Sequence, residues 1–346
     1  VFGIASTERL SAYESYPPAA DLTHQQTGAV IVFILFGLWS ARAHLRDVMR
    51  TVWNPRNGVD DSEEVLRYRT AVVGFLASFA AIGFWLWRSG VPGLYVPVLL
   101  VVSVIFFALV ARVVATAGVP TARSPIVPAY FIISGFGTSL LGTKGLVALT
   151  YTFIWQGESR TSPMVAASNG LKLAESVKGS KKRLFWGLMI ALVASLLASL
   201  WTTLELAYSN GAINLYLLQW AGAHGWPYIG PTSTEMPGAN MRGWLFKGIG
   251  GAFEFLLMWG QHRWYWWPLH PIGFTIAFGW LTSSIWFSAL IAWILKAIIL
   301  HVGGGKLFQT LKPFFLGLIL GEVLTGGGWA VVYALTVENG RILSTM

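Results

Sequence analysis

The sequence predicts an all-α integral membrane protein, and three observations support this prediction. Of its 346 residues, 55% are hydrophobic and 11% are charged, whereas soluble domains carry about 25% charged residues. Apolar segments near the ~20 residues that a helix needs to cross a bilayer recur along the chain. Prolines and glycines interrupt other apolar segments, a pattern typical of broken or re-entrant helices. We therefore expect a polytopic helical bundle with roughly six to nine crossings.

The first apolar segment, residues 27–41, is short for a crossing, but its helical pattern continues through Arg42 and Met49. We expect one long helix that leaves the membrane. In the polar loop that follows, Asp61 and Glu64 have the spacing of a capping box, which predicts the start of a helix. Six further apolar segments predict crossings, at about Thr70–Trp87, Leu94–Ala117, Leu184–Tyr208, Gly243–Trp259, Ile272–Leu300 and Phe314–Thr336.

Two regions between these segments differ from simple crossings. Residues Gly118–Gln156 are apolar, but proline or glycine occurs every few positions, so we expect broken or re-entrant helices there. Residues Gly211–Met241 predict a short interfacial helix at 213–223 followed by a loop. Small residues recur every four positions on the 184–208 segment and predict close helix packing, namely Ala191, Ser195, Ser199 and Thr203.

The predicted domain organisation is simple. Residues 1–26 form a segment outside the membrane, residues 27–346 form the polytopic membrane domain, and we find no soluble domain. Lysine and arginine are concentrated between the first two crossings and in residues 157–183. Because basic loops remain in the cytoplasm, we expect both of these loops to be cytoplasmic.

Three carboxylates within apolar segments are the candidate functional residues, namely Glu322, Glu254 and Glu205. Ionisable residues at membrane depth are costly, which favours a functional role. Desolvation disfavours the charged form of a carboxyl group, so such a group can bind and release a proton near neutral pH. A structural role is the alternative, since Lys247 lies two helical turns before Glu254 on the same helix face.

Glycine-rich sequence surrounds two of the candidates. Gly317 and Gly321 precede Glu322 and Thr325 at small-residue spacing, and the glycines at 326–328 can unwind the helix and expose carbonyl groups. Close helix packing explains these glycines equally well. Lys144 lies in a glycine-rich break, where it can pair with a substrate carboxylate or simply reach lipid headgroups.

Several functional classes are not expected. The chain has no cysteine, which excludes disulfides and cysteine-based metal or redox chemistry. We find no metal-ligand spacing and expect no metal or cofactor. The basic residues behind the net charge of +9 lie in short runs beside apolar segments, where they indicate membrane topology. Nucleic acid is therefore not an expected partner. No loop motif supports catalysis, and we expect no enzyme, although an enzyme acting on lipid remains an alternative.

Three late segments form one group of motifs, Trp266–Gly273, Ala292–Lys296 and Pro313–Glu322, and three earlier ones accompany them, Asp60–Glu64, Tyr68–Ala71 and Ala117–Pro120. The late segments resemble the end of a large, functionally uncharacterised family of bacterial multi-pass membrane proteins, and the earlier ones are similar to the same family. The resemblance spans most of the chain, with the end segment at about 258–336, and implies a multi-pass protein of the bacterial cytoplasmic (inner) membrane. Family members are typically longer, which implies that this chain corresponds to their C-terminal part.

The last predicted helices contain a Pro-x-Gly helix start at Pro271–Gly273 and a Gly-x-x-x-Gly-Glu pattern at Gly317–Glu322. In these two motifs the chain is similar to the oligopeptide transporter superfamily. The similarity implies proton-driven uptake of peptides or metal chelates.

We therefore expect a secondary, proton-coupled transporter of a small organic solute such as a peptide, with membrane lipids around it. The predicted transport cavity lies between the 118–156 region and the helix of Glu322. The alternative is a non-transporting subunit of a larger membrane complex, energy-converting or pigment-binding, with other membrane subunits or further copies of itself as partners.

Overall fold

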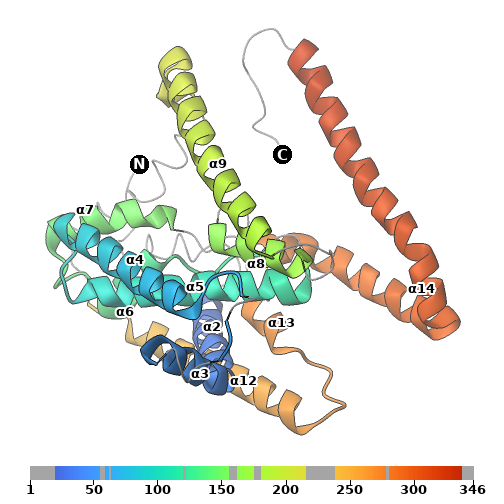
Figure 1. Ribbon diagram of the computed structural model, residues 1–346, viewed down its shortest axis with the longest axis horizontal. Helices are drawn as coiled ribbons and strands as arrows, with labels where there is room; N and C mark the ends of the chain where they lie inside the picture. The colour runs from blue at the N-terminus through green and yellow to red at the C-terminus, as the bar shows by residue number, and fades with distance from the viewer. Residues whose placement is uncertain are drawn as a thin grey trace. The chain divides into compact units, whose positions relative to one another are not determined.

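The computed structural model describes residues 20–54, 59–61, 64–119, 122–155, 162–174, 181–215, 238–277 and 280–336. These residues form helices and their connections, without a strand among them, which confirms the predicted all-α class (Figure 1). Five helices in this part of the chain are long and apolar enough to cross a membrane: Asp21–Ser40, Tyr68–Arg88, Tyr95–Ala117, Lys182–Asn210 and Ile285–Val332. The chain divides into two compact units, Val1–Ser283 and Ser284–Met346.

Helix α5 (Tyr95–Ala117) forms the centre of the first unit, and most of its side chains are buried. It contacts four other helices, α2 (Ala20–Ser40), α4 (Tyr68–Arg88), α6 (Pro128–Phe136) and α8 (Pro163–Ala174). Near its end, the Arg112 guanidinium lies 4.4 Å from the centre of the Phe33 ring and so joins α5 to α2. Gly118 ends the helix in the left-handed conformation, with φ of 65°.

The prediction of one long first helix is wrong, because the chain turns at Ala41. Helix α2 ends at Ser40, and a separate helix, α3 (Arg42–Trp53), follows it. The composition changes at the same point, from an apolar helix to an amphipathic one with three arginines. A helix that lies on a membrane and one that crosses it need different orientations, so a break between them is expected on physical grounds.

The predicted capping box at Asp61 and Glu64 is also wrong, since the described residues from Glu64 to Arg67 are not helical and α4 begins only at Tyr68. Asp61 instead accepts a hydrogen bond at 2.8 Å from the backbone N–H of Tyr68, the first residue of α4. The backbone N–H groups in the first turn of a helix have no partner within the helix. The carboxylate therefore stabilises the start of α4 from seven residues upstream.

The predicted broken helices in the 118–156 region are confirmed. The region contains α6, α7 (Gly142–Tyr151) and a short 3₁₀ helix, η2 (Thr152–Ile154). At 1.5 Å per residue, α6 and α7 are each about 15 Å long, half of the hydrocarbon thickness of a bilayer. Helix α6 is almost completely buried, so the protein itself surrounds this interrupted backbone. Helix α8 was not predicted.

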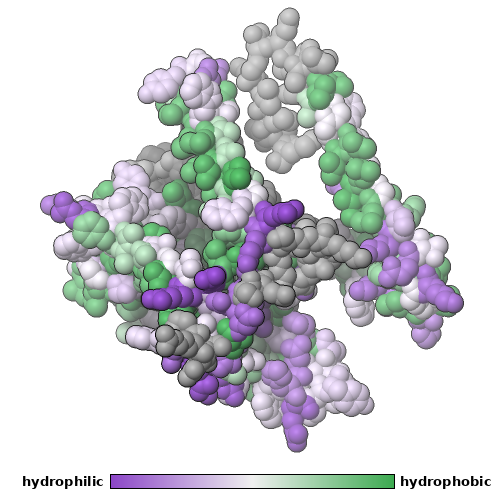
Figure 2. Space-filling view, viewed as in Figure 1, coloured by the Kyte–Doolittle hydropathy of each residue, from purple (hydrophilic) through white to green (hydrophobic). Residues whose placement is uncertain are grey.

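Helix α9 (Lys181–Asn210) covers the predicted crossing at 184–208, is one of the candidate membrane-crossing helices, and ends before a 3₁₀ turn, η3 (Ala212–Asn214). The predicted close packing of its small residues is not seen, because Ala191, Ser195, Ser199 and Thr203 are all exposed in the described part of the chain. Figure 2 shows apolar surface along α9. Most of the predicted interfacial helix at 213–223 lies outside the described residues.

The predicted single helix from Ile272 to Leu300 is wrong. The segment is divided between a short helix, α13 (Pro271–Ile276), and the start of α14 (Trp280–Thr336). At Gly304, α14 has φ of 61° and ψ of −160°, a conformation that only glycine adopts readily, and the helix bends there (Figure 1). Hydrophilic side chains gather at this bend, between two apolar halves that are each long enough for one crossing (Figure 2).

Helices α2 and α12 (Met241–Arg263) lie side by side and run in the same direction. His24 contacts Gly243 at one end of the pair, and the ring of Phe36 stacks on that of His262 at the other. The backbones touch through glycines. A Cβ atom at Gly28 would lie 1.8 Å from the carbonyl oxygen of Lys247, and one at Gly250 would lie 1.9 Å from that of Gln25. Glycine is therefore the residue that permits this contact.

We expect Gly250→Ala to destabilise the protein by about 2–3 kcal/mol, because its Cβ would overlap a backbone atom that cannot move alone. The measurement is the thermal unfolding midpoint in detergent. Gly248→Ala is the matched control, since a Cβ there meets no atom within 4 Å, and it should leave the midpoint unchanged or raise it. Equal midpoints for the two variants would contradict the backbone contact.

We expect Asp61→Ala to destabilise the start of α4 by about 1 kcal/mol, the usual cost of losing a helix-capping acceptor. Asp61→Asn keeps an oxygen acceptor and should lose much less. Amide hydrogen exchange in the first turn of α4, followed by mass spectrometry, measures the difference. If both variants exchange equally fast, the side-chain oxygen of Asp61 has no capping role.

Candidate functional site

The candidate site is the contact between α2 and α12, which we call the α2/α12 interface. Of the charged residues considered in the sequence analysis, only Lys247 and Glu254 are buried in the described part of the chain, and they share one face of α12. The two residues are seven positions apart, which corresponds to about 10 Å along the helix. Lys247 is 4% exposed and Glu254 is 0% exposed.

Aromatic rings surround the ammonium group of Lys247. Its Nζ lies 5.2 Å from the ring centre of Phe131 and 4.9 Å from that of Trp244, both within the range of cation–π attraction. Phe136 makes edge-to-face contacts with both rings. The phenylalanines belong to α6, so one of the interrupted helices forms part of the surroundings of this buried cation.

The first turn of α12 is fixed to the end of α6. Trp244 Nε1 donates a hydrogen bond of 2.6 Å to the carbonyl oxygen of Gly135. The backbone N–H of Asn240 donates to the carbonyl oxygen of Ser134 at 3.0 Å, and the Asn240 side chain accepts from the Gly243 N–H. These bonds satisfy the backbone of α6 where it ends inside the protein, as an interrupted helix requires.

Glu254 has a different environment. Both of its carboxylate oxygens are buried, and neither forms a hydrogen bond with any described residue, Lys247 included. The suggested structural pairing of Lys247 with Glu254 is therefore not made as a hydrogen bond. An ionised carboxylate buried without a donor is strongly destabilising, so this position calls for a proton, a cation or a polar ligand as its counterpart.

A second interrupted helix, α13, packs against both α2 and α12. The side-chain amide of Gln26 donates a hydrogen bond of 2.7 Å to the carbonyl oxygen of Thr275, and both residues are buried. Phe274 contacts Phe253, the residue before Glu254, with ring centres 4.8 Å apart. His270 caps α13 by accepting from the N–H of Ile272. The α2/α12 interface, which carries the buried charges, thus contacts two interrupted helices, α6 and α13.

A shallow groove of about 660 Å³ follows the outer side of the interface. Glycines form much of its surface, and Lys247 and Trp244 line it as well. The residues that line it are Gly28, Ile31, Val32, Trp244, Lys247, Gly248, Gly251, Ala252, Phe255 and Leu256. Glu254 is not among them, because it faces the interior of the unit.

The other predicted site residues lie on other helices. Lys144 is exposed on α7, and Glu322 is exposed on α14 in the second unit. Gly317 and Gly321 lie on the same helix, and a Cβ at either would meet no other described atom within 4 Å. The predicted unwinding at 326–328 is wrong, since α14 stays helical there and bends at Gly304 instead.

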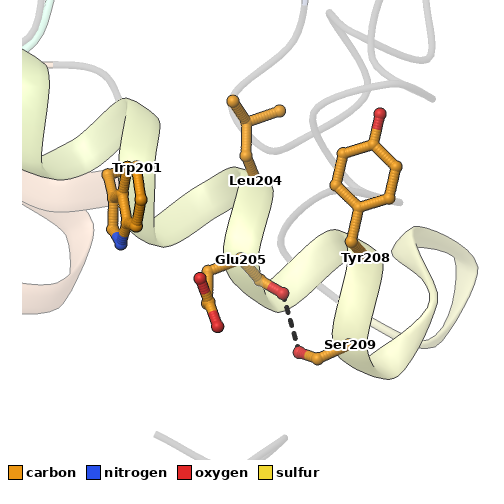
Figure 3. A pocket seen from close by; sticks show the side chains of 5 residues that line it. All are labelled: Trp201, Leu204, Glu205, Tyr208 and Ser209. Atoms are coloured by element: carbon orange, nitrogen blue, oxygen red, sulfur yellow. Dashed lines mark hydrogen bonds between the residues drawn. The ribbon is translucent and has the colours of Figure 1, made fainter.

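Glu205 lies near the end of α9, beside a surface depression of about 440 Å³ (Figure 3). All of the described residues that line the depression come from α9: Trp201, Leu204, Glu205, Tyr208 and Ser209. The carboxylate points away from Leu204 and Tyr208, and Ser209 donates to the backbone carbonyl of Glu205 at 2.7 Å (Figure 3). One helix with exposed side chains does not enclose a solute.

Sequence reasoning missed two buried polar residues of α2, His24 and Gln26. They were excluded because the apolar segment was taken to start at Thr27, whereas α2 begins at Ala20. The signal that could have found them is the helical spacing of His24 and Gly28, which continues the apolar pattern toward the N-terminus. In the described residues, no group of three metal-ligating side chains comes together.

The comparison with known proteins identifies a family. No curated protein and no solved structure matches the chain. The profile of a family of unknown function, DUF6785, matches residues 2–343. This match agrees with the resemblance to an uncharacterised family. Because it covers nearly the whole sequence, the chain belongs to the family of unknown function DUF6785.

Proposed function

We propose that this protein is a secondary, proton-coupled transporter of a small organic solute in the bacterial cytoplasmic membrane. The observation that carries the proposal is the buried carboxylate of Glu254, which accepts no hydrogen bond from any described residue. A carboxyl group enclosed among helices is retained in a membrane protein chiefly where an ion or a solute visits it.

The surroundings of Glu254 support the same proposal. Transporters bind solutes and coupling ions where helices are discontinuous. The α2/α12 interface contacts α6 through Trp244 and contacts α13 through Gln26. In the proposed cycle, Glu254 is protonated while the interface is closed and loses its proton when movement of a broken helix admits water.

The proposed chemical class of the solute is supported by sequence similarity and not by the geometry of the site. A peptide or a similar small organic molecule is carried over from the similarity of Pro271–Gly273 and Gly317–Glu322 to the oligopeptide transporter superfamily. Glu322 remains a second candidate for the coupling proton, and Glu205, Lys144, Gly317 and Gly321 remain candidates for the pathway.

A non-transporting subunit of a larger complex is the second proposal, and one observation favours it. Four small residues spaced by one helical turn, 191 to 203 on α9, are exposed in the described residues. Small residues in membrane helices usually mark a contact with another helix, whereas lipid requires no such pattern. Co-purification of other chains in fixed stoichiometry would support this alternative.

We expect Glu254→Gln to reduce proton-coupled uptake at least tenfold, because glutamine has the size of the acid but cannot release a proton. The assay uses proteoliposomes that contain a pH-sensitive dye and a panel of di- and tripeptides, with and without an imposed pH gradient. Glu254→Asp should retain part of the activity.

Glu64→Gln is the matched control, since it removes one exposed carboxylate outside the crossings and should leave uptake unchanged. Glu322→Gln tests the second carboxylate under the same conditions. Uptake that still depends on the pH gradient in both the Glu254 and the Glu322 variants would exclude them as proton sites.

A further inference from the structure

Helix α3 differs from every crossing segment, because it is amphipathic and its charged face is basic. It begins one residue after α2, a candidate membrane crossing, and it contacts α4, the next candidate crossing. A helix that joins the same ends of two crossings lies at the level of the membrane surface. The positive-inside rule assigns this connection to the cytoplasmic side, where anionic lipids are concentrated.

The inner face of α3 is fixed against its neighbours. Thr51 is buried and accepts a hydrogen bond at 3.1 Å from the backbone N–H of Val59. On the same side, His44 makes an edge-to-face contact with Tyr68 of α4, with ring centres 5.9 Å apart. These contacts determine the rotation of α3 about its axis and therefore which side chains face outward.

Two stripes of side chains occupy the outward face. Leu45, Met49 and Trp53 are spaced by four residues and exposed, Trp53 by 82%. The second stripe is basic and equally spaced, and it consists of Arg42, Arg46 and Arg50. Three residues of an α-helix correspond to 300°, so the stripes run parallel and about 60° apart. Large apolar side chains thus lie directly beside three cations.

We propose that α3 is an interfacial helix whose arginines bind the phosphate groups of anionic phospholipids, while its apolar stripe inserts into the acyl region below them. A lipid leaflet matches the two stripes in order of depth, since it presents phosphates above hydrocarbon. The Arg42 guanidinium stacks 4.2 Å from the ring centre of Trp39 at the end of α2. Stacking on a tryptophan that ends a crossing positions this cation at headgroup level.

A protein partner is the less suitable occupant of this face. The outward face of α3 meets the end of α2 where Arg42 contacts Trp39, and Leu35, Leu38 and Trp39 of α2 are exposed as well. In a membrane that surface contacts lipid. Asp47 pairs with Arg50 at 3.6 Å, but the Arg50 side chain is 69% exposed, so it stays accessible to a phosphate.

The first test measures lipid binding to the full chain in detergent by native mass spectrometry. We expect dioleoylphosphatidylglycerol to bind at least tenfold more tightly than dioleoylphosphatidylcholine. Replacing Arg42, Arg46 and Arg50 together by Gln should reduce this affinity ratio at least tenfold, since each arginine near an anionic surface contributes about fivefold in affinity. Inorganic phosphate at millimolar concentration should not displace the lipid, because it lacks an acyl chain.

The matched control removes the same number of exposed charges elsewhere, by Arg88→Gln, Lys306→Gln and Lys312→Gln in one variant. It should keep the preference for phosphatidylglycerol. If the two triple variants retain equal preference, or if inorganic phosphate displaces the lipid, the proposal is overturned.

The second test measures depth and does not depend on charge. Because the chain has no cysteine, single cysteines carry a spin label without further changes. In reconstituted protein, labels at Leu45 and Met49 should be more accessible to oxygen than to an aqueous nickel chelate, as at Phe75 on the exposed face of α4. Labels at both sites that behave like one at Val59, in the exposed connection, would overturn the proposal.

Discussion

The arrangement of the first unit depends on the backbone contact between α2 and α12. Gly28 and Gly250 allow carbonyl groups of the facing helix to occupy the space where a side chain would begin. Such an approach gains dispersion energy that lipid cannot supply, and it leaves little room for water. The interrupted helices α6 and α13 are positioned by hydrogen bonds to this pair, from Trp244 and Gln26.

The same contact explains why the two buried charges have such different surroundings. Lys247 extends toward α6, where aromatic ring faces supply an electrostatic substitute for water. Glu254 has no comparable substitute among the described residues, although it is equally buried. The surroundings of Lys247 suit a permanent cation, whereas those of Glu254 suit a group that gains and loses a proton. That asymmetry, rather than burial alone, favours Glu254 over the exposed Glu322 and Glu205.

Hydropathy predicted α4, α5 and α9 well, because an uninterrupted apolar segment of bilayer length has few other conformations available. Hydropathy failed where a single residue determines whether a helix continues or bends. Nothing in the apolar pattern distinguishes the glycines at 303–305, where α14 bends, from those at 326–328, which stay helical. The turn at Ala41 was missed because alanine favours helix. Of the candidate site, Lys247 and Glu254 were predicted to share a face, but the pairing of α12 with α2, more than 200 residues earlier in the chain, follows from no local signal.

The parallel direction of α2 and α12 has a topological consequence. Neighbouring helices that point the same way through a membrane must be separated by an odd number of crossings, and three helices of crossing length, α4, α5 and α9, lie between them. If α12 also crosses the bilayer, these three crossings already account for the parallel direction, and the half-length helices α6 and α7 can form a re-entrant segment without changing it. A re-entrant segment there would put the lysine- and arginine-rich connections before α4 and before α9 on one side of the bilayer.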